Sequence, residues 1–236
     1  MAAAQAKTAG SLPRRFITFE GGEGAGKSTQ IRLLAETLRQ AETLQQAGQS
    51  VVLTREPGGS PGGEEIRKLL VEGKPGRWTA ETEALLHFAA RADHLDKIIR
   101  PALAAGDWVL CDRFADSTIA YQGYGHGLDL NWLAELRARI VGETEPGLTV
   151  IFDLPVEVGL ARAAGRATAG AAANHAAEDR YERMDRAFHQ RLRDGFLSIA
   201  KTAPARCRVV PADRPVDEVA AALRQLVAQH FGLTLG

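Results

Sequence analysis

Five short runs of apolar and β-branched residues recur along this chain, at positions 16–19, 51–54, 108–111, 148–152 and 207–210. Each run has the length and composition of a buried β-strand. The segments between the runs favour helices: after the first run, Ile31, Leu34 and Leu38 share one helical face, and Leu44 is a further candidate. Helices are also expected near 62–72, 79–105 and 215–230. This alternation predicts an α/β fold with one five-stranded parallel sheet and helices on both faces.

One segment does not fit the alternation. Residues 163–177 are rich in alanine, which favours a helix, but Gly165, Gly170 and Asn174 favour a mobile surface loop equally well. The pattern leaves both structures open. Since no internal repeat or linker divides the chain, we expect one domain over 14–236, preceded by a flexible tail over 1–13.

The strongest chemical signal follows the first predicted strand. The sequence Gly-Gly-Glu-Gly-Ala-Gly-Lys-Ser at 21–28 matches the P-loop pattern in full, between a strand and a helix. Glycines let successive backbone N–H groups point at phosphate oxygens, and the helix adds its positive end. The expected ligands of the ATP phosphates are Gly21, Gly24, Gly26, Lys27, Ser28 and Thr29. The motif predicts the three-layer P-loop NTPase fold, with Lys27 as a catalytic cation and the Ser28 hydroxyl on Mg²⁺.

A second charged pair lies directly after the third predicted strand. Asp112 and Arg113 are placed at the carboxyl end of a parallel strand, where open α/β sheets bind ligands. We expect Asp112 to hold a water on Mg²⁺ and Arg113 to add a cation, although a structural salt bridge is the alternative. The sequence lacks the Asn-Lys-x-Asp segment of GTPases, and a mechanical ATPase would usually be longer and end this strand with an acidic pair. A kinase is therefore favoured.

Composition narrows the class of protein further. The 236 residues are 45% hydrophobic and 25% charged, as in soluble globular proteins, and 29 basic residues balance 29 acidic ones. A nucleic acid partner is therefore not predicted. No apolar run approaches the roughly 20 residues of a membrane span, and the N-terminus lacks the apolar core of a signal peptide. Cys111 and Cys207 show no metal-ligand spacing, which fits a reducing compartment. We expect a cytoplasmic protein that acts on small molecules.

The P-loop and four further motifs resemble those of the thymidylate kinase family, which converts dTMP to dTDP with ATP. The motifs, in order, are the P-loop with its flanks at 19–29, Thr-Arg-Glu-Pro-Gly-Gly at 54–59, Phe-Ala-Ala-Arg at 88–91, Asp-Arg at 112–113 and Ser-Thr-Ile-Ala-Tyr-Gln-Gly at 117–123. The resemblance implies a nucleoside monophosphate kinase of nucleotide biosynthesis that uses ATP and Mg²⁺ and forms a homodimer. Apolar residues near 79–105 and 115–140 could form the dimer interface, but periodicity cannot distinguish them from core.

The resemblance also implies which residues bind the sugar and the phosphate of dTMP. Glu23, the acid inside the P-loop, matches the residue that reaches the sugar 3′-hydroxyl. A carboxylate among phosphate-binding amides would be repelled by the triphosphate unless it pointed elsewhere, and the hydroxyl offers it a donor. Arg55 and Arg113 match the arginines that hold the dTMP phosphate, for which planar guanidinium groups are suited. Arg67 is similar to another substrate-site arginine, although arginines on helix surfaces are common.

Other positions match the base end of the family site. Arg91 matches the arginine that donates to a thymine carbonyl, and Thr118, Tyr121 and Gln122 match residues around the base and sugar. A tyrosine near the 2′ position can exclude a ribose hydroxyl. Gln122 can both donate and accept, as the edge of thymine requires.

The chain departs from the family four residues before the matching arginine. Many members carry there a phenylalanine that stacks on the base, whereas this chain has His87, followed by Phe88. Neighbouring side chains on a helix point about 100° apart, so both cannot stack. The sequence leaves open which of the two does.

The catalytic arginine is expected on a lid near 163–180. One family design places a basic residue after the acid of the P-loop, but this chain has Gly24 there. Arg166 is the first candidate for the arginine on the transferring phosphoryl group, and Arg162 and Arg180 are the alternatives. Two other functions compete: a deoxynucleoside kinase, against which Glu23 and the motif at 54–59 argue, and a regulatory protein that binds ATP without turning over a second substrate.

Overall fold

The five predicted strands are all present in the computed structural model, which describes residues 14–73, 76–168, 181 and 183–235. They are β1 Phe16–Glu20, β2 Val51–Arg55, β3 Trp108–Asp112, β4 Leu148–Asp153 and β5 Cys207–Pro211. They form one parallel sheet in the order β2-β3-β1-β4-β5, which confirms the α/β fold class. The tail predicted over 1–13 lies outside the described residues.

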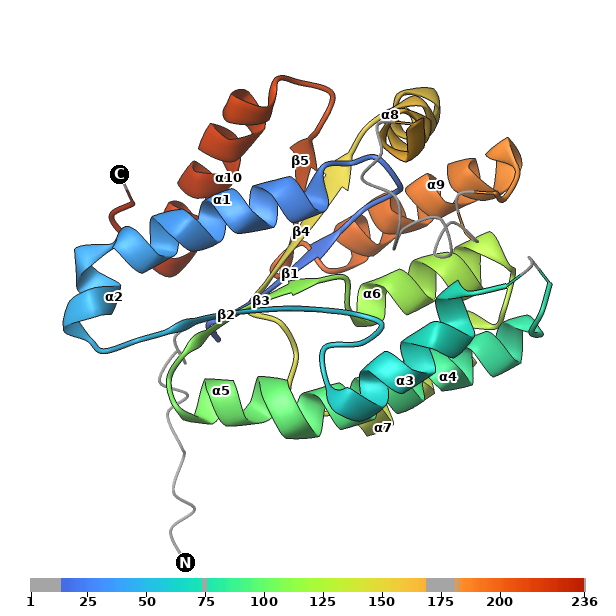
Figure 1. Ribbon diagram of the computed structural model, residues 1–236, viewed down its shortest axis with the longest axis horizontal. Coiled ribbons are helices and arrows are strands. Elements are labelled where there is room, and N and C mark those ends of the chain that lie inside the picture. Colours follow the sequence, from blue (N-terminus) through green and yellow to red (C-terminus); the bar gives the residue numbers. More distant parts are fainter. Residues whose placement is uncertain (1–13, 74–75, 169–180, 182, 236) are drawn as a thin grey trace, which may run out of the picture.

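The register of the sheet brings the ends of three strands level. Asp112, at the end of β3, pairs with Phe19 of β1 on one side and with Arg55 of β2 on the other. The loops after β1, β2 and β3 therefore leave the sheet at one edge (Figure 1). This edge gathers the P-loop, the motif at 54–59 and the Asp112-Arg113 pair.

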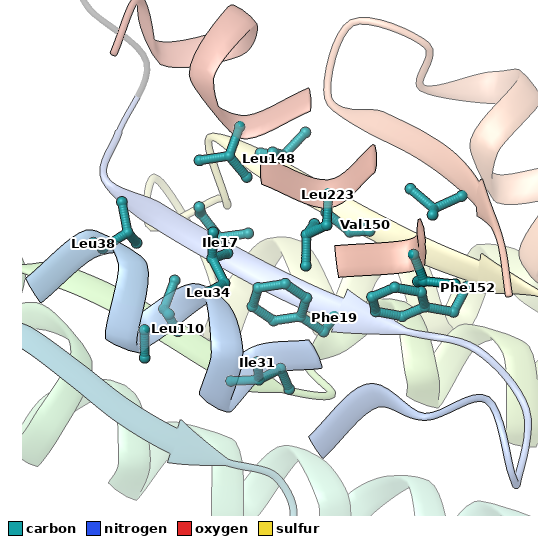
Figure 2. Packing of buried hydrophobic residues seen from close by; sticks show 14 of the residues in the cluster. Ile17, Phe19, Ile31, Leu34, Leu38, Leu110, Leu148, Val150, Phe152 and Leu223 are labelled. Atoms are coloured by element: carbon teal, nitrogen blue, oxygen red, sulfur yellow. The ribbon is translucent and has the colours of Figure 1, made fainter. Parts of the chain in front are cut away.

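One face of the sheet is covered by α1, Lys27–Gln40, and α10, Val216–Phe231, which lie side by side, with the short α2, Glu42–Gln46, after α1 (Figure 1). Figure 2 shows how Leu34 of α1 packs near Phe19 of β1 in this core. The other predicted positions of the helical face are buried in the same cluster, including Leu44, which belongs to α2.

The opposite face is covered by a longer series of helices. These are α4 Ala80–His94, the π-helical turn η1 Leu95–Ile99, α5 Arg100–Ala104, α6 Ala115–Thr118, the π-helical turn η2 Ile119–Gly125 and α9 Arg186–Thr202. Side chains alternate along the strands: Phe16 and Val109 belong to the core on this face, whereas Ile17 and Leu110 belong to the core under α1. Two further helices, α3 Pro61–Val71 and α7 Leu130–Ile140, pack on α4 from outside.

The helices differ from the predicted ones in two places, and a third segment, for which the sequence left helix and loop open, is partly helical. The helix expected over 79–105 runs as α4, η1 and α5, and α9 was not predicted. The alanine-rich segment begins inside α8, Val156–Thr168, so its first part is helical, while 169–177 lies outside the described residues. Among the helices that the structure describes, none combines the length and apolar character that crossing a membrane requires.

Candidate active site

The P-loop turns between β1 and α1 on two glycines in the left-handed region, Gly24 at φ 71° and Gly26 at φ 79°. Lys27 opens α1, and its Nζ donates to the carbonyl oxygens of Gly21 at 3.1 Å and Gly22 at 2.9 Å. Burial and the nearby Arg113 guanidinium lower the pKa of Lys27 from 10.5 to about 8, even though neighbouring carboxylates oppose this. The loop thus holds a desolvated cation beside its backbone amides, as a phosphate site requires.

The Glu23 side chain turns toward the end of β3. Its Oε1 accepts from Arg113 Nη2 at 2.9 Å and from the Tyr121 hydroxyl at 2.7 Å. The Arg113 guanidinium also lies over the Tyr121 ring, 5.1 Å from its centroid. Burial alone would raise the pKa of Glu23, but Arg113, Lys27 and the Tyr121 hydroxyl outweigh it and lower the pKa from 4.5 to about 2. Glu23 is therefore an ionised acceptor at neutral pH.

The turn after β3 is stabilised by hydrogen bonds to the buried side chain of Glu20. Glu20 accepts from the backbone N–H of Phe114 at 2.8 Å and from the Ser117 hydroxyl at 2.5 Å. Arg113 adopts the left-handed region, at φ 67°, which is costly for a residue other than glycine. Asp112 accepts from the Ser28 hydroxyl at 2.8 Å, so the two expected magnesium ligands are neighbours.

Two further arginines lie near the end of β2: Arg55 is its last residue and Arg67 belongs to α3. Arg55 is half exposed and pairs with Glu64 at 3.1 Å, and Arg67 Nη1 donates to the Pro57 carbonyl at 2.7 Å. Pro57 follows a cis peptide bond with Glu56. The turn of the motif at 54–59 thus has beside it Arg55, a predicted phosphate arginine, and Arg67, the further substrate-site candidate.

Arg91 is fully buried in a network of polar side chains. Its Nε donates to Glu56 Oε2 at 2.8 Å, and its Nη2 donates to the Phe114 carbonyl and the Thr118 hydroxyl, both at 3.0 Å. Glu56 Oε1 in turn lies 3.0 Å from Nδ1 of His94. These contacts fix the guanidinium plane and occupy its Nε and Nη2 edges, leaving Nη1 for another acceptor.

Glu83, His87 and Arg91 follow one another at four-residue spacing along α4, and therefore share one face. The facing turn is η2, where the wide π-helical geometry directs both Tyr121 and Gln122 inward. Gln122 Nε2 lies 3.3 Å from Glu83 Oε2 and 3.3 Å from the Tyr181 hydroxyl, and His87 Nε2 lies 3.3 Å from the same hydroxyl. Four of the predicted base-site residues are thus brought together.

Among the buried polar atoms that have no hydrogen-bond partner in the described part of the chain, two belong to predicted base-site residues. One is a donor, Arg91 Nη1, and the other an acceptor, Gln122 Oε1. Leaving a buried polar atom unpaired costs about 1–3 kcal/mol of stability, so such an atom in a binding site indicates a hydrogen bond to the ligand. A ligand edge with one acceptor and one donor would satisfy both.

The comparison with known protein families agrees with this geometry. The family model for thymidylate kinase matches residues 19–223. The chain belongs to the thymidylate kinase family. The thymidylate kinase of Caulobacter vibrioides is 54% identical over 218 residues, covering 92% of this chain and 98% of the relative. That of Ruegeria pomeroyi is 51% identical over 220 residues, covering 93% and 97%.

The fold agrees with that of a solved thymidylate kinase. The crystal structure of the enzyme from Ehrlichia chaffeensis matches with a TM-score of 0.68 and 36% identity, over 90% of this chain and 97% of that one. The activity is that of the family: transfer of a phosphoryl group from ATP to dTMP, which gives dTDP. The resemblance, fold class and enzyme activity inferred from sequence are confirmed. A deoxynucleoside kinase and a non-catalytic ATP sensor are excluded as descriptions of the chain.

The two stacking candidates occupy different places in this thymidylate kinase. Phe88 is buried with Ala84 and Leu133 in the core between α4 and α7, and its ring lies under the Arg91 guanidinium at 4.8 Å. His87 is half-buried and lies on the face that carries the base-site residues. Burial, followed by the charge of Arg91, lowers the pKa of His87 to about 3, so its ring is neutral. The geometry favours His87 as the flat surface and gives Phe88 a packing role.

Most of the predicted lid of the thymidylate kinase lies outside the described residues, including 169–180 and thus Arg180. Arg162 is described: its Nη1 donates to the Ala212 carbonyl at 2.9 Å, so it is bound to the loop after β5. Arg166 belongs to α8, which carries it toward the undescribed segment. Arg162 is therefore the weaker candidate for the phosphoryl group.

The start of α8 packs directly on the P-loop of the thymidylate kinase. A Cβ atom on Gly159 would lie 2.5 Å from the Glu23 carbonyl oxygen, and one on Gly24 would lie 2.0 Å from the Gly159 carbonyl oxygen. Backbone touches backbone, so no side chain fits at either position. This contact explains why the P-loop carries glycine, and no basic residue, after Glu23.

We expect Gly159→Ala to lower the unfolding temperature by several degrees and to raise KM for ATP, because the added methyl group displaces the loop backbone at a cost of about 1–3 kcal/mol. Gly165→Ala is the matched control, since a Cβ there would meet nothing within 4 Å on the same helix. It should leave KM unchanged. Thermal unfolding and ATP titration of both variants check this, and equal behaviour of the two would refute the contact.

Several site residues were missed by the sequence analysis. Glu20 holds the turn after β3. Glu56 accepts from the Arg91 guanidinium and is itself contacted by His94. Glu83 and Tyr181 contact Gln122. Glu56 lies inside a recognised motif, and Glu83 shares the four-residue spacing of His87 and Arg91. The position of Tyr181 depends on a contact across 59 residues with Gln122, which no local pattern shows.

Proposed function

We propose that thymine binds between the faces of α4 and η2, lying on His87, with its O4 accepting from Arg91 Nη1 and its N3–H donating to Gln122 Oε1. The observation that carries this proposal is the pair of buried, unpartnered atoms, one donor and one acceptor. Thymine offers one acceptor and one donor side by side on this edge. Thr118 supports the arrangement by accepting from Arg91 Nη2 at 3.0 Å.

The sugar and phosphate of dTMP extend from the base toward the P-loop in this proposal. Glu23 accepts from the 3′-hydroxyl, since its ionised carboxylate needs donors. Tyr121, which already donates to Glu23, fills the space beside the 2′ carbon and excludes a ribose hydroxyl. Arg113 and Arg55 hold the dTMP phosphate, with Arg67 beside them, because the guanidinium fork suits phosphate oxygens.

ATP binds with its phosphates on the amides of the P-loop from Gly21 to Thr29, and Lys27 moves from the loop carbonyls to the β- and γ-phosphates. An oxygen of the dTMP phosphate attacks the γ-phosphorus, the bond to the β–γ bridging oxygen breaks, and ADP leaves. Lys27 and Arg166, carried by α8 and the lid, neutralise the charge that spreads over the equatorial oxygens.

Mg²⁺ fits the oxygens of Ser28 and Asp112, which lie 2.8 Å apart next to the loop. A hydroxyl, one carboxylate and phosphate oxygens are the ligands that Mg²⁺ prefers at nucleotide sites. No group of three or more histidine, cysteine or acidic side chains among the described residues would hold a metal by itself. Bound there, Mg²⁺ would neutralise phosphate charge, and the Ser28 and Asp112 side chains would exchange their mutual hydrogen bond for this role.

We also propose that the enzyme is a cytoplasmic homodimer. Leu85 and Leu130 are among the large apolar side chains that stay exposed, at 50% and 40%. Leu85 lies on α4, within 79–105, and Leu130 begins α7, within 115–140, the two segments that are candidates for the dimer interface. The two cysteines are both buried and free, as in a reducing compartment.

A modified substrate tests the assignment of the base. N3-methyl-dTMP keeps O4 but replaces the N3 proton with a methyl group, so it can neither donate to Gln122 Oε1 nor fit against it. We expect its kcat/KM to fall at least about a hundredfold below that of dTMP, since an unpaired buried acceptor and a steric clash combine. Equal use of both substrates, measured by coupled ADP release, would overturn the proposal.

A further inference from the structure

Glu83 is an acid that the reaction itself does not need. It lies in the first turn of α4, and its side chain is 2% exposed. Glu81 occupies the same turn but is exposed, so it satisfies the helix N-terminus without the cost of burial. Burying a carboxylate costs free energy unless hydrogen bonds compensate for the lost water. The hydrogen-bond partners of Glu83 lie at the base end of the site.

The Glu83 carboxylate faces the amide of Gln122. Glu83 Oε2 accepts from the Tyr181 hydroxyl at 3.1 Å and lies 3.3 Å from Gln122 Nε2. Oε2 of Glu83 acts as an acceptor, since it accepts from the Tyr181 hydroxyl, whereas a glutamine amide donates at one end and accepts at the other. Turning the Gln122 amide over would place Oε1 against Oε2 of Glu83, two acceptors in contact.

We propose that Glu83 is a specificity-determining positioning residue: its carboxylate fixes the Gln122 amide so that Oε1 faces the substrate base. Tyr181 assists, because its hydroxyl donates to Glu83 and can then accept from Gln122 Nε2. Both amide hydrogens are thereby directed away from the base. Gln122 Oε1, fully buried and unpartnered among the described residues, is the atom left to face it.

This orientation decides which pyrimidine is accepted, given the proposed thymine contacts, on which the inference rests. Thymine presents a donor at N3, and cytosine presents an acceptor there. A Gln122 amide held with its oxygen inward pairs with thymine and repels cytosine. An amide free to turn over would donate to N3 of cytosine as readily as it accepts from N3–H of thymine, so Glu83 excludes the wrong base at N3. Arg91 Nη1, a donor, separately opposes the 4-amino group of cytosine.

The test compares dTMP with dCMP as substrates of Glu83→Gln. A glutamine at 83 can donate as well as accept, so the Gln122 amide is released to turn over. We expect the ratio of kcat/KM for dTMP to that for dCMP to fall at least about tenfold, with kcat for dTMP changing less than KM. Glu81→Gln, in the same turn, is the matched control and should keep the wild-type ratio.

The outcomes separate the inference from the proposed function. A wild-type enzyme that does not prefer dTMP over dCMP would sink the thymine contacts themselves. A wild-type enzyme that prefers dTMP, together with a Glu83→Gln variant of unchanged ratio, would sink the role of Glu83 alone.

If Glu83→Gln does not fold, NMR of the wild-type complex with dTMP decides. Gln122 amide protons that show nuclear Overhauser contacts to the Tyr181 side chain support the orientation. Contacts from those protons to the thymine imino proton, with none to Tyr181, overturn it.

Discussion

Replacing Arg113 with alanine is expected to lower kcat/KM for dTMP by about a thousandfold, because truncating one partner of a largely buried charge pair costs about 2–5 kcal/mol. Arg113 holds Glu23 at 2.9 Å and donates to the Gly21 carbonyl at 3.1 Å. In the proposed site, its loss removes a ligand of the dTMP phosphate and also frees the carboxylate proposed to accept from the sugar 3′-hydroxyl. The loss should therefore appear mainly in the use of dTMP.

Two further variants sharpen this prediction. Arg113→Lys keeps the charge but lacks the planar fork, so its kcat/KM should lie between those of the wild type and Arg113→Ala. Arg39→Ala is the control: Arg39 is exposed at the end of α1 opposite to the P-loop, and it donates to the Val51 carbonyl at the start of β2. Steady-state kinetics with varied dTMP measure all three. A loss below tenfold in Arg113→Ala would contradict the role of this arginine.

Replacing Lys27 with methionine is expected to abolish most of the turnover, by at least about a hundredfold, without destabilising the ligand-free protein. Electrostatic contacts to the transferring group are lost. The folded protein, however, no longer has to bury an ammonium group whose hydrogen-bond acceptors, among the described residues, are two loop carbonyls. Thermal unfolding should give a midpoint equal to or above that of the wild type.

The pH dependence of stability follows from the same side chain. The pKa of Lys27 is about 8 in the folded state and 10.5 ordinarily, so the unfolded chain binds more protons between these values. The contribution of Lys27 therefore makes the wild type more stable as pH rises from 8 toward 10.5. Lys27→Met should lack this rise, and Lys97→Met, at an exposed ion pair with Asp93, should keep it. A marked drop in midpoint at pH 7 in Lys27→Met would count against the account.

The three inner strands, β1, β3 and β4, could be predicted from sequence because they are buried along nearly their whole length and are therefore almost continuously apolar. The edge strands β2 and β5 are only partly buried, and their β-branched residues identified them. The segment containing α9 carried a comparable signal that was missed: Asp185 caps the helix through the Phe188 N–H at 2.7 Å, and Leu192, Phe196 and Ile199 continue its apolar face. Polar residues and arginines between these positions obscured the period. The π-helical turns have no comparable pattern, since the extra residue per turn is set by tertiary packing.

The site residues likewise fall into those that could be placed from sequence and those that could not. Lys27, Ser28 and Asp112 could be placed because they are close in sequence to strand ends that the fold brings together. The choice between His87 and Phe88 could not, because it depends on the rotation of α4 against α7. Nor could the unpartnered atoms of Arg91 and Gln122 be foreseen, since being unpartnered is a property of the whole packed network.

A panel of nucleoside monophosphates measures the base specificity of the site. Coupled ADP release by the wild-type enzyme, with Mg²⁺ and ATP, is measured with dTMP, dUMP, dCMP, dAMP and dGMP. We expect kcat/KM for dTMP to exceed those for dCMP and both purine nucleotides by at least about a hundredfold, with dUMP in between because it keeps the same O4 and N3–H edge. ADP release that no monophosphate stimulates, or that dCMP stimulates as well as dTMP, would contradict the account.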